Sequence, residues 1–171
     1  DINPSSENLR PSVSIIVAAR NEERNIRVAL QSLLDLDYPH LQLILVNDRS
    51  EDSTGDILDE IKTGDPRLEI LHLRELPKGW LGKTHALWQG SLKATGDLLL
   101  FTDADVVMEP DTLARAVSYF QAEKLDHLAA TPEARMPSLF LNMFGVTFGF
   151  FFGIFTRPWK APDPRSDCHI G

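Results

Sequence analysis

Short, mostly apolar runs alternate along the chain with stretches in which apolar residues recur every three or four positions. The runs cover residues 13–18, 41–46, 68–73 and 98–102. Such runs predict buried strands, and the spacing of three or four predicts helices that bury one face. Because the two patterns alternate, the sequence indicates an α/β fold, a three-layer α/β/α sandwich with a mostly parallel sheet.

Each run is followed by a predicted helix. The helical stripes lie in residues 26–34, 57–61, 83–94 and 113–120. Pro110 suits the first residue of the last helix, where its missing N–H costs no hydrogen bond. A further short run, Leu128–Thr131, predicts a fifth strand.

The run that begins at Leu98 ends abruptly in two carboxylates, Asp103 and Asp105. Its uncharged character predicts a strand buried on both faces, as in a parallel sheet covered by helices. Ligands of open α/β sheets bind at the carboxyl ends of the strands. Two readings stay open at this point: a divalent cation shared with substrate phosphates, or a polar strand end that begins a turn.

Residues Leu139–Phe155 are almost wholly apolar, and Gly145, Gly149 and Gly153 recur there at four-residue spacing. A membrane-spanning helix needs roughly 20 apolar residues, and such glycine spacing occurs where helices meet closely in lipid. A span would separate the α/β part from the polar residues that follow. We therefore expect a helix that contacts the membrane surface or a membrane helix; the alternative is a core helix of a larger domain.

Composition narrows the function classes. The 171 residues are 43% hydrophobic and 25% charged, which is typical of one globular domain. A net charge of −8 opposes nucleic-acid binding. The single cysteine, Cys168, excludes an intramolecular disulfide. Both ends look like cuts in something longer, and we expect a truncated fold.

Polar side chains follow three of the predicted strands. Asn21 and Glu22 follow the first, Asp48 follows the second, and Asp103 and Asp105 follow the fourth. Parallel strands end at one edge of a sheet, so these groups are expected to converge. Such a cleft offers acceptors to a nucleoside, and a bound Mg²⁺ or Mn²⁺ would offset diphosphate charge.

The loop from Lys78 to Lys83 adds cations and an aromatic ring. Lys83 is a candidate phosphate contact, or a solvated lysine that opens a helix. Trp80 is a candidate for stacking on a sugar or covering a lipid, or for packing within its own loop.

Several spaced motifs resemble the nucleotide-sugar-binding half of a family 2 glycosyltransferase with the GT-A fold. The matching stretches are Ser14–Glu22, Leu45–Ser50, Asp52–Thr54, Gly82–Lys83, Ala86–Leu87, Gly90 and Gly96–Asp105. The resemblance covers about residues 11–132. The variant at residues 79–83 is similar to members that glycosylate lipids, of the hopanoid-associated, carotenoid and ceramide types.

The resemblance implies a role for each strand end. Asp48 would recognise the uracil or equivalent base, and the backbone of Ala19, Asn21 and the side chain of Glu22 would lie near the nucleoside.

It implies a second group of residues around the diphosphate. Asp105 would coordinate Mn²⁺ or Mg²⁺, Asp103 would lie near ribose and metal, and Lys83 would sit close to the nucleotide.

The reaction implied is an inverting transfer from a nucleotide-sugar, such as a UDP-sugar, to a hydroxyl of a lipid or glycan. The family's general base would lie downstream of Gly171, so this fragment is expected to bind donor and to be inactive alone. The expected organisation is a flexible leader at 1–10, the donor-binding subdomain at 11–135 and a membrane-proximal helix and loop at 136–171. The full-length protein would work at the cytoplasmic face of the cell membrane.

Two alternatives compete with this reading. A nucleotidyltransferase would show a glycine-rich basic loop after the first strand, where residues 19–23 contain one arginine and no glycine. A non-catalytic, membrane-associated scaffold would not need intact carboxylates at Asp48, Asp103 and Asp105.

Overall fold

The computed structural model describes residues 10–62, 64–133 and 138–156. Its strands are β1 (Val13–Ala19), β2 (Leu41–Asp48), β3 (Leu68–Leu73) and β4 (Leu98–Asp103). Its helices are α1 (Ile26–Leu34), α2 (Thr54–Lys62), α3 (Gly82–Ser91), α4 (Thr112–Ala122) and α5 (Leu139–Thr156). What the sequence predicts for residues 1–9 and 157–171 lies outside the described residues.

The four strands form one parallel sheet in the order β3-β2-β1-β4. Within the described residues the predicted α/β class and parallel sheet are confirmed. The predicted strands match β1 to β4 within two residues at each end. The central strand β1 pairs with β2 on one side and β4 on the other, which brings the carboxyl ends of all three to one edge.

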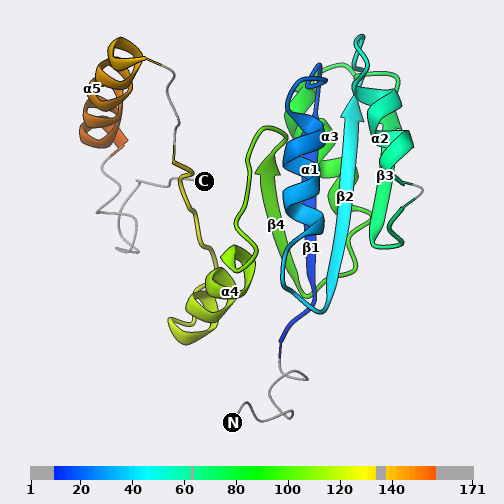
Figure 1. Ribbon diagram of the computed structural model, residues 1–171, viewed down its shortest axis with the longest axis horizontal. Helices are drawn as coiled ribbons and strands as arrows, with labels where there is room; N and C mark the ends of the chain where they lie inside the picture. The colour runs from blue at the N-terminus through cyan, green and yellow to red at the C-terminus, as the bar shows by residue number, and fades with distance from the viewer. Residues whose placement is uncertain (1–9, 63, 134–137, 157–171) are drawn as a thin grey trace. The chain divides into compact units, whose positions relative to one another are not determined.

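Helices cover both faces of the sheet and create the three layers (Figure 1). One face packs against the apolar sides of α1, α2 and α4, which supply Leu30, Leu58 and Leu113 to the main core. The other face packs against α3, whose Ala86 meets Ile16 of the sheet. The β-branched and leucine side chains of β1 and β2 are therefore buried on both sides, as their uncharged sequences predict.

Gly90 lets α3 lie close to the sheet. A Cβ at this position would stand 2.5 Å from Cγ2 of Ile16 and 3.1 Å from Cγ2 of Val46. Only a residue without a side chain fits this contact. The close approach of α3 also carries its first turn towards the ends of β1 and β4.

The prediction that β4 is buried on both faces is wrong. Its residues alternate between half-buried and exposed, and Leu99 and Phe101 are 47% and 48% exposed. β4 is an edge strand in the described chain, and α3 packs on β1 and β2 instead. The side of β4 that faces the α3 layer is therefore left open.

Two further predictions fail. Leu128–Thr131 forms no strand; these residues are exposed and join no ladder, because a short apolar run is not held extended without a neighbouring strand. Pro110 does not begin α4, which starts at Thr112. The Pro110 carbonyl instead accepts a hydrogen bond from the Asp37 N–H at 2.9 Å, so it ties the loop before α4 to the loop after α1.

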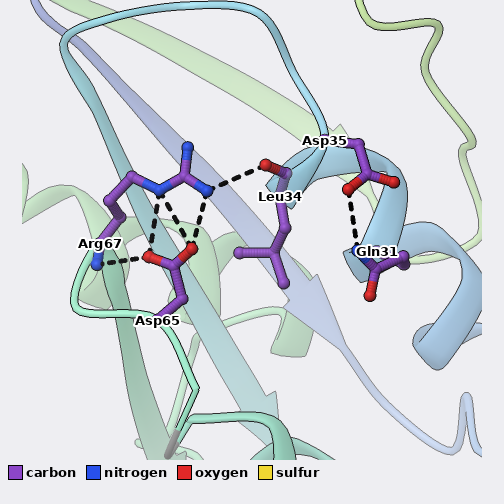
Figure 2. A network of polar contacts seen from close by, with 5 residues as sticks. All are labelled: Gln31, Leu34, Asp35, Asp65 and Arg67. Carbon is purple, nitrogen blue, oxygen red and sulfur yellow. Dashed lines mark hydrogen bonds and ion pairs between the residues drawn. The ribbon is translucent and has the colours of Figure 1, made fainter.

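An arginine joins the end of α1 to the beginning of β3 (Figure 2). Nη2 of Arg67 donates to the Leu34 carbonyl at 2.9 Å and to Oδ2 of Asp65 at 2.7 Å. The carbonyl is one of those that a helix end leaves without an intrahelical partner. Beside it, Nε2 of Gln31 donates to Oδ1 of Asp35 at 2.9 Å. The network therefore ties the C-terminal end of α1 to the segment that leads into β3.

The chain divides into two compact units, with the boundary between Ala122 and Glu123. The second unit contains α5, which is the phenylalanine-rich segment of the sequence. Its side chains include Phe140, Phe144 and Phe155, which are 78%, 63% and 87% exposed. Among the described residues, no helix has the length and apolar character required to cross a membrane.

Candidate functional site

A cavity of about 370 Å³ opens at the carboxyl ends of β1, β2 and β4. Its lining comes from these strand ends and from the first turn of α3. The lining residues are Ala18, Ala19, Arg20, Glu22, Asp48, Gly82, Lys83, Asp103, Ala104 and Asp105. Every predicted donor-binding or metal residue except Asn21 is in this set, and the candidate Trp80 is not.

The sheet register explains the convergence. Ala18 of β1 pairs with Asp103 of β4, and Ala19 pairs with Asn47 of β2. The three strands therefore end level with one another. The last residue of β2, Asp48, and the segments that follow β1 and β4, at Arg20 and Asp105, surround one space.

Asn21 lies outside the cavity lining and holds two loops together instead. Its backbone is in the left-handed region, with φ of 57°, which asparagine tolerates better than most residues. Its N–H donates to Oγ of Ser50 at 3.0 Å, and its Oδ1 accepts from the Glu51 N–H at 2.9 Å. The structure therefore gives Asn21 a supporting position between the β1–α1 and β2–α2 loops.

The loop that carries Glu22 is fixed by a buried hydroxyl. The Glu22 N–H donates to Oγ1 of Thr54 at 2.8 Å, and Thr54 is fully buried at the start of α2. The Glu22 carbonyl accepts the N–H of Ile26 at 2.9 Å and so begins α1. Glu22 therefore lines the cavity from a turn whose backbone is hydrogen-bonded on both sides.

Asp48 is the most enclosed carboxylate of the site, at 3% exposed. Arg49 grips it with two hydrogen bonds, from Nε to Oδ1 at 2.8 Å and from Nη2 to Oδ2 at 3.1 Å. These bonds raise the pKa of the Arg49 guanidinium above its ordinary value. The two bonds orient the carboxylate, whose remaining lone pairs can accept from a ligand.

Gly82 allows α3 to begin directly over this pair. A Cβ on Gly82 would lie 2.7 Å from Oδ2 of Asp48 and 2.8 Å from Nη2 of Arg49. Any larger residue at this position would displace the carboxylate or the helix. The position thus has a tight steric requirement.

Lys83 and Asp103 form an ion pair across the cavity, between Nζ and Oδ1. Both side chains are more than half exposed, at 61% and 56%. Such an exposed pair contributes little to stability. It is therefore free to open when a ligand with stronger charges enters.

Asp105 also lines the cavity, and it has no ion-pair partner in the part of the chain that the structure describes. Asp103 and Asp105 supply two carboxylates, and the described residues contain no group of three metal-ligating side chains. Mg²⁺ and Mn²⁺ are commonly held by one or two carboxylates together with substrate phosphates and water. The donor set therefore fits such an ion when it arrives with a phosphorylated ligand.

The charge of the cavity lining also favours a divalent cation. Within the lining, Glu22, Asp48, Asp103 and Asp105 face Arg20 and Lys83, and Arg49 pairs with Asp48 beside it. A diphosphate would enter a region with more negative than positive charge. A divalent cation bound with it would reverse that balance.

Sequence reasoning did not assign Arg20, Arg49 or Gly82 to the site. Arg20 directly follows β1, and a cation at a strand end is a signal that the sequence contains. The grip of Arg49 on its neighbour Asp48 depends on its left-handed backbone, with φ of 57°. No sequence pattern reveals that conformation.

This fold and site define a class: a nucleotide-diphospho-sugar transferase domain of the GT-A type, with a carboxylate-rich cleft at the ends of parallel strands. The model of the family "Glycosyl transferase family 2" matches residues 14–171. The chain belongs to this family, which confirms the resemblance drawn from its motifs.

Individual glycosyltransferases are similar to this chain in sequence and in structure. The beta-monoglucosyldiacylglycerol synthase of Synechocystis is 37% identical over 112 residues, covering 64% of this chain and 23% of that protein. The mannosyltransferase PcManGT of Pyrobaculum calidifontis, solved with GDP-Man and Mn²⁺, is 32% identical with a TM-score of 0.60. That match covers 67% of this chain and 33% of the solved one.

A third match is TarS of S. aureus in complex with UDP. It is 25% identical with a TM-score of 0.58, over 74% of this chain and 38% of that chain. The match thus spans about a quarter of the curated relative's length and 33% and 38% of the two solved chains.

Proposed function

We propose that this chain is the donor-binding part of an inverting, metal-dependent glycosyltransferase that moves a sugar from a UDP-sugar to a lipid hydroxyl. The observation that carries the proposal is the single cavity in which Asp48, Lys83, Asp103 and Asp105 meet. The complexes of relatives with UDP and with GDP-Man and Mn²⁺ support it.

The residues divide between nucleoside and diphosphate. Asp48, fixed by Arg49, would accept a hydrogen bond from the N–H of the base, with Glu22 and the backbone of Ala19 around the nucleoside. Asp103 would accept from ribose hydroxyls and face the metal. Asp105 would be the principal metal ligand.

The chemistry follows from the charge on the leaving group. Displacement of the nucleoside diphosphate builds negative charge on its oxygens, and fixed positive charge at that place lowers the barrier. When bound, a divalent ion would supply that charge as a Lewis acid. Lys83 would leave Asp103 to meet the same phosphate oxygens, adding a positive point charge.

Activation of the acceptor needs a carboxylate positioned as general base. We assign none of the described residues to that role, and we expect the chain alone to bind donor without transferring the sugar. The relation to monoglucosyldiacylglycerol synthases favours a lipid acceptor. Membrane contact through Leu139–Phe155 and a location at the cytoplasmic face of the membrane are part of the same proposal.

Calorimetry with UDP tests the donor site. We expect binding in the presence of Mn²⁺ or Mg²⁺ that disappears with EDTA and in Asp105→Ala, because the carboxylate and the ion together hold the diphosphate. Asp111→Ala, which removes a 62% exposed carboxylate outside the cavity lining, is the matched control. Binding indifferent to metal and to Asp105 would contradict the proposal, and a complete absence of heat would favour the scaffold.

A further inference from the structure

The outer side of α3 carries a row of exposed apolar side chains. Leu81, Trp88 and Leu92 are 77%, 44% and 60% exposed. Separations of seven and four residues place them along one side of the helix. Trp80 adds to the row from the preceding loop, with its ring centroid 5.1 Å from that of Trp88. We refer to Trp80, Leu81, Trp88 and Leu92 as the α3 ridge.

The two tryptophans of the ridge lie beside a buried histidine of α3. His85 is 4% exposed, and its ring meets Trp80 edge-on at 5.3 Å between centroids. It also lies 6.3 Å from the ring of Trp88. The loop tryptophan is therefore anchored to the helix rather than free in solvent, and the apolar surface is already formed.

The charge around the ridge differs from that of the whole chain. Residues 77–96 contain Lys78, Lys83 and Lys93 and no aspartate or glutamate, whereas the chain carries a net charge of −8. Lys83 pairs with Asp103, and Lys93 lies 4.0 Å from Glu69. Lys78 has no ion-pair partner among the described residues. Negative charge in this region thus comes only from neighbouring elements.

The combination of side chains selects the occupant. Tryptophan rings suit the boundary between lipid and water, leucines enter the acyl region, and Lys78, which is engaged neither in the cavity nor in an ion pair among the described residues, can meet an anionic headgroup. A carbohydrate would stack on the rings but leave Leu81 and Leu92 in water. A lipid surface covers all of these groups at once.

We propose that the α3 ridge docks on the surface of a bilayer that contains anionic lipids. The same helix places Gly82 and Lys83 in the cavity lining, so docking would hold the donor site beside the lipid surface. The use of this contact for catalysis rests on the proposed lipid acceptor. The contact itself requires no nucleotide.

Tryptophan fluorescence tests the contact directly. The chain has three tryptophans, so Trp159→Phe leaves only the two ridge indoles. With vesicles of phosphatidylglycerol and phosphatidylcholine, we expect a blue-shifted emission that brominated acyl chains quench. This readout reports on the ridge even if α5 also binds the vesicle. Unchanged emission, with or without sedimentation of the chain with vesicles, would overturn the proposal.

Substitutions in the Trp159→Phe chain distinguish binding through the ridge from nonspecific adsorption to vesicles. Leu81→Ser with Leu92→Ser should reduce the partition coefficient defined by the indole signal about tenfold, because two acyl-facing side chains are lost. Val28→Ser, a 62% exposed position on α1, should leave it unchanged. Equal partitioning of all three proteins would contradict the proposal. So would a ridge-dependent dimer without vesicle binding, which would make the ridge an interface between copies.

Binding of UDP, measured on the same variants, keeps the two proposals apart. We expect it unchanged by the ridge substitutions. Absence of UDP binding by the unsubstituted chain would contradict the proposed function without affecting the proposal that the ridge binds a bilayer. Failure of the vesicle test would contradict only the proposal that the ridge binds a bilayer.

Discussion

At the scale of single residues, Asp48 shows how much of a site is set by its immediate neighbours. The carboxylate is almost fully buried, and Arg49 and Gly82 together fix its direction. Neither neighbour needs to touch a ligand to matter. The affinity for a nucleotide should therefore depend on Gly82 as well as on the carboxylate.

Replacing Gly82 by alanine should weaken UDP binding about tenfold. The added Cβ would lie 2.7 Å from Oδ2 of Asp48, so the carboxylate must turn away from the base. Calorimetry with Mn²⁺ measures the loss. Gly64→Ala is the matched control, because its Cβ would meet only the Ile61 carbonyl at an ordinary 3.5 Å. Equal affinities for the two variants would show that Asp48 does not require its observed position.

Asp65 predicts a dependence of stability on pH. The hydrogen bonds from Arg67 lower the pKa of this carboxyl below its ordinary value of 3.8 in the folded chain. A lowered pKa stabilises the fold above the unfolded-state pKa, and that stability is lost as pH falls through the folded-state pKa. Asp65→Asn should therefore cost about 1 kcal/mol at pH 7 and less at pH 3.

Urea denaturation at the two pH values measures this difference. Asp111→Asn is the control, because its carboxylate is 62% exposed and lies 3.6 Å from Arg115. Its substitution should change the free energy of unfolding little at either pH. A loss for Asp65→Asn that is the same at pH 3 as at pH 7 would contradict the assignment.

At the scale of elements, the turn after β2 is held by a chain of three side chains from β2, β3 and α2. Nδ2 of Asn47 donates to Nδ1 of His72 at 3.0 Å, and Nε2–H of His72 donates to Oδ1 of Asp59 at 3.1 Å. This orientation leaves Oδ1 of Asn47 to accept the Ser50 N–H at 3.2 Å. The histidine thereby positions the turn that carries Asp48.

His72→Phe should weaken UDP binding several-fold, because Asn47 loses the acceptor that orients its amide. His72→Asn places an amide oxygen close to where Nδ1 stands, and it should restore most of the affinity. Thermal unfolding of both variants accompanies the calorimetry. If the affinity for UDP follows the melting temperature, and not the presence of a hydrogen-bond acceptor at position 72, then His72 contributes through packing alone.

At the scale of the whole molecule, the two units have different chemistry. The first contains the sheet and the cavity, and the second contains the phenylalanine-rich α5. The proposed donor binding of the first unit and the proposed membrane contact of α5 should be separable by substitution.

In a chain that also carries Leu81→Ser and Leu92→Ser, Phe144→Ser with Phe151→Ser should reduce sedimentation with vesicles at least tenfold, because both side chains, each 63% exposed, would lose their contact with lipid. The affinity for UDP should stay the same. Thr147→Ser, on the same helix, is the control for vesicle binding. A parallel fall in UDP affinity would mean that the second unit helps to form the donor site.

Sequence periodicity determined most of the fold at this scale. Short, mostly apolar runs between polar turns favour strands, and β1 to β4 appear where those runs lie. The fifth strand at Leu128–Thr131 failed because pairing needs a neighbour, which local sequence does not supply. The exposure of Phe101 in β4 likewise depends on which strand stands at the edge of the sheet.

The sequence by itself determined that carboxylates would gather where β1, β2 and β4 end, because parallel strands share a direction and their polar tips must meet. Only the tertiary structure decided how those carboxylates are held. Arg49 grips Asp48, Lys83 crosses to Asp103, and Asn21 turns away from the cavity to join two loops. These contacts depend on backbone conformation and on the close approach of α3, which arise only when the layers pack together.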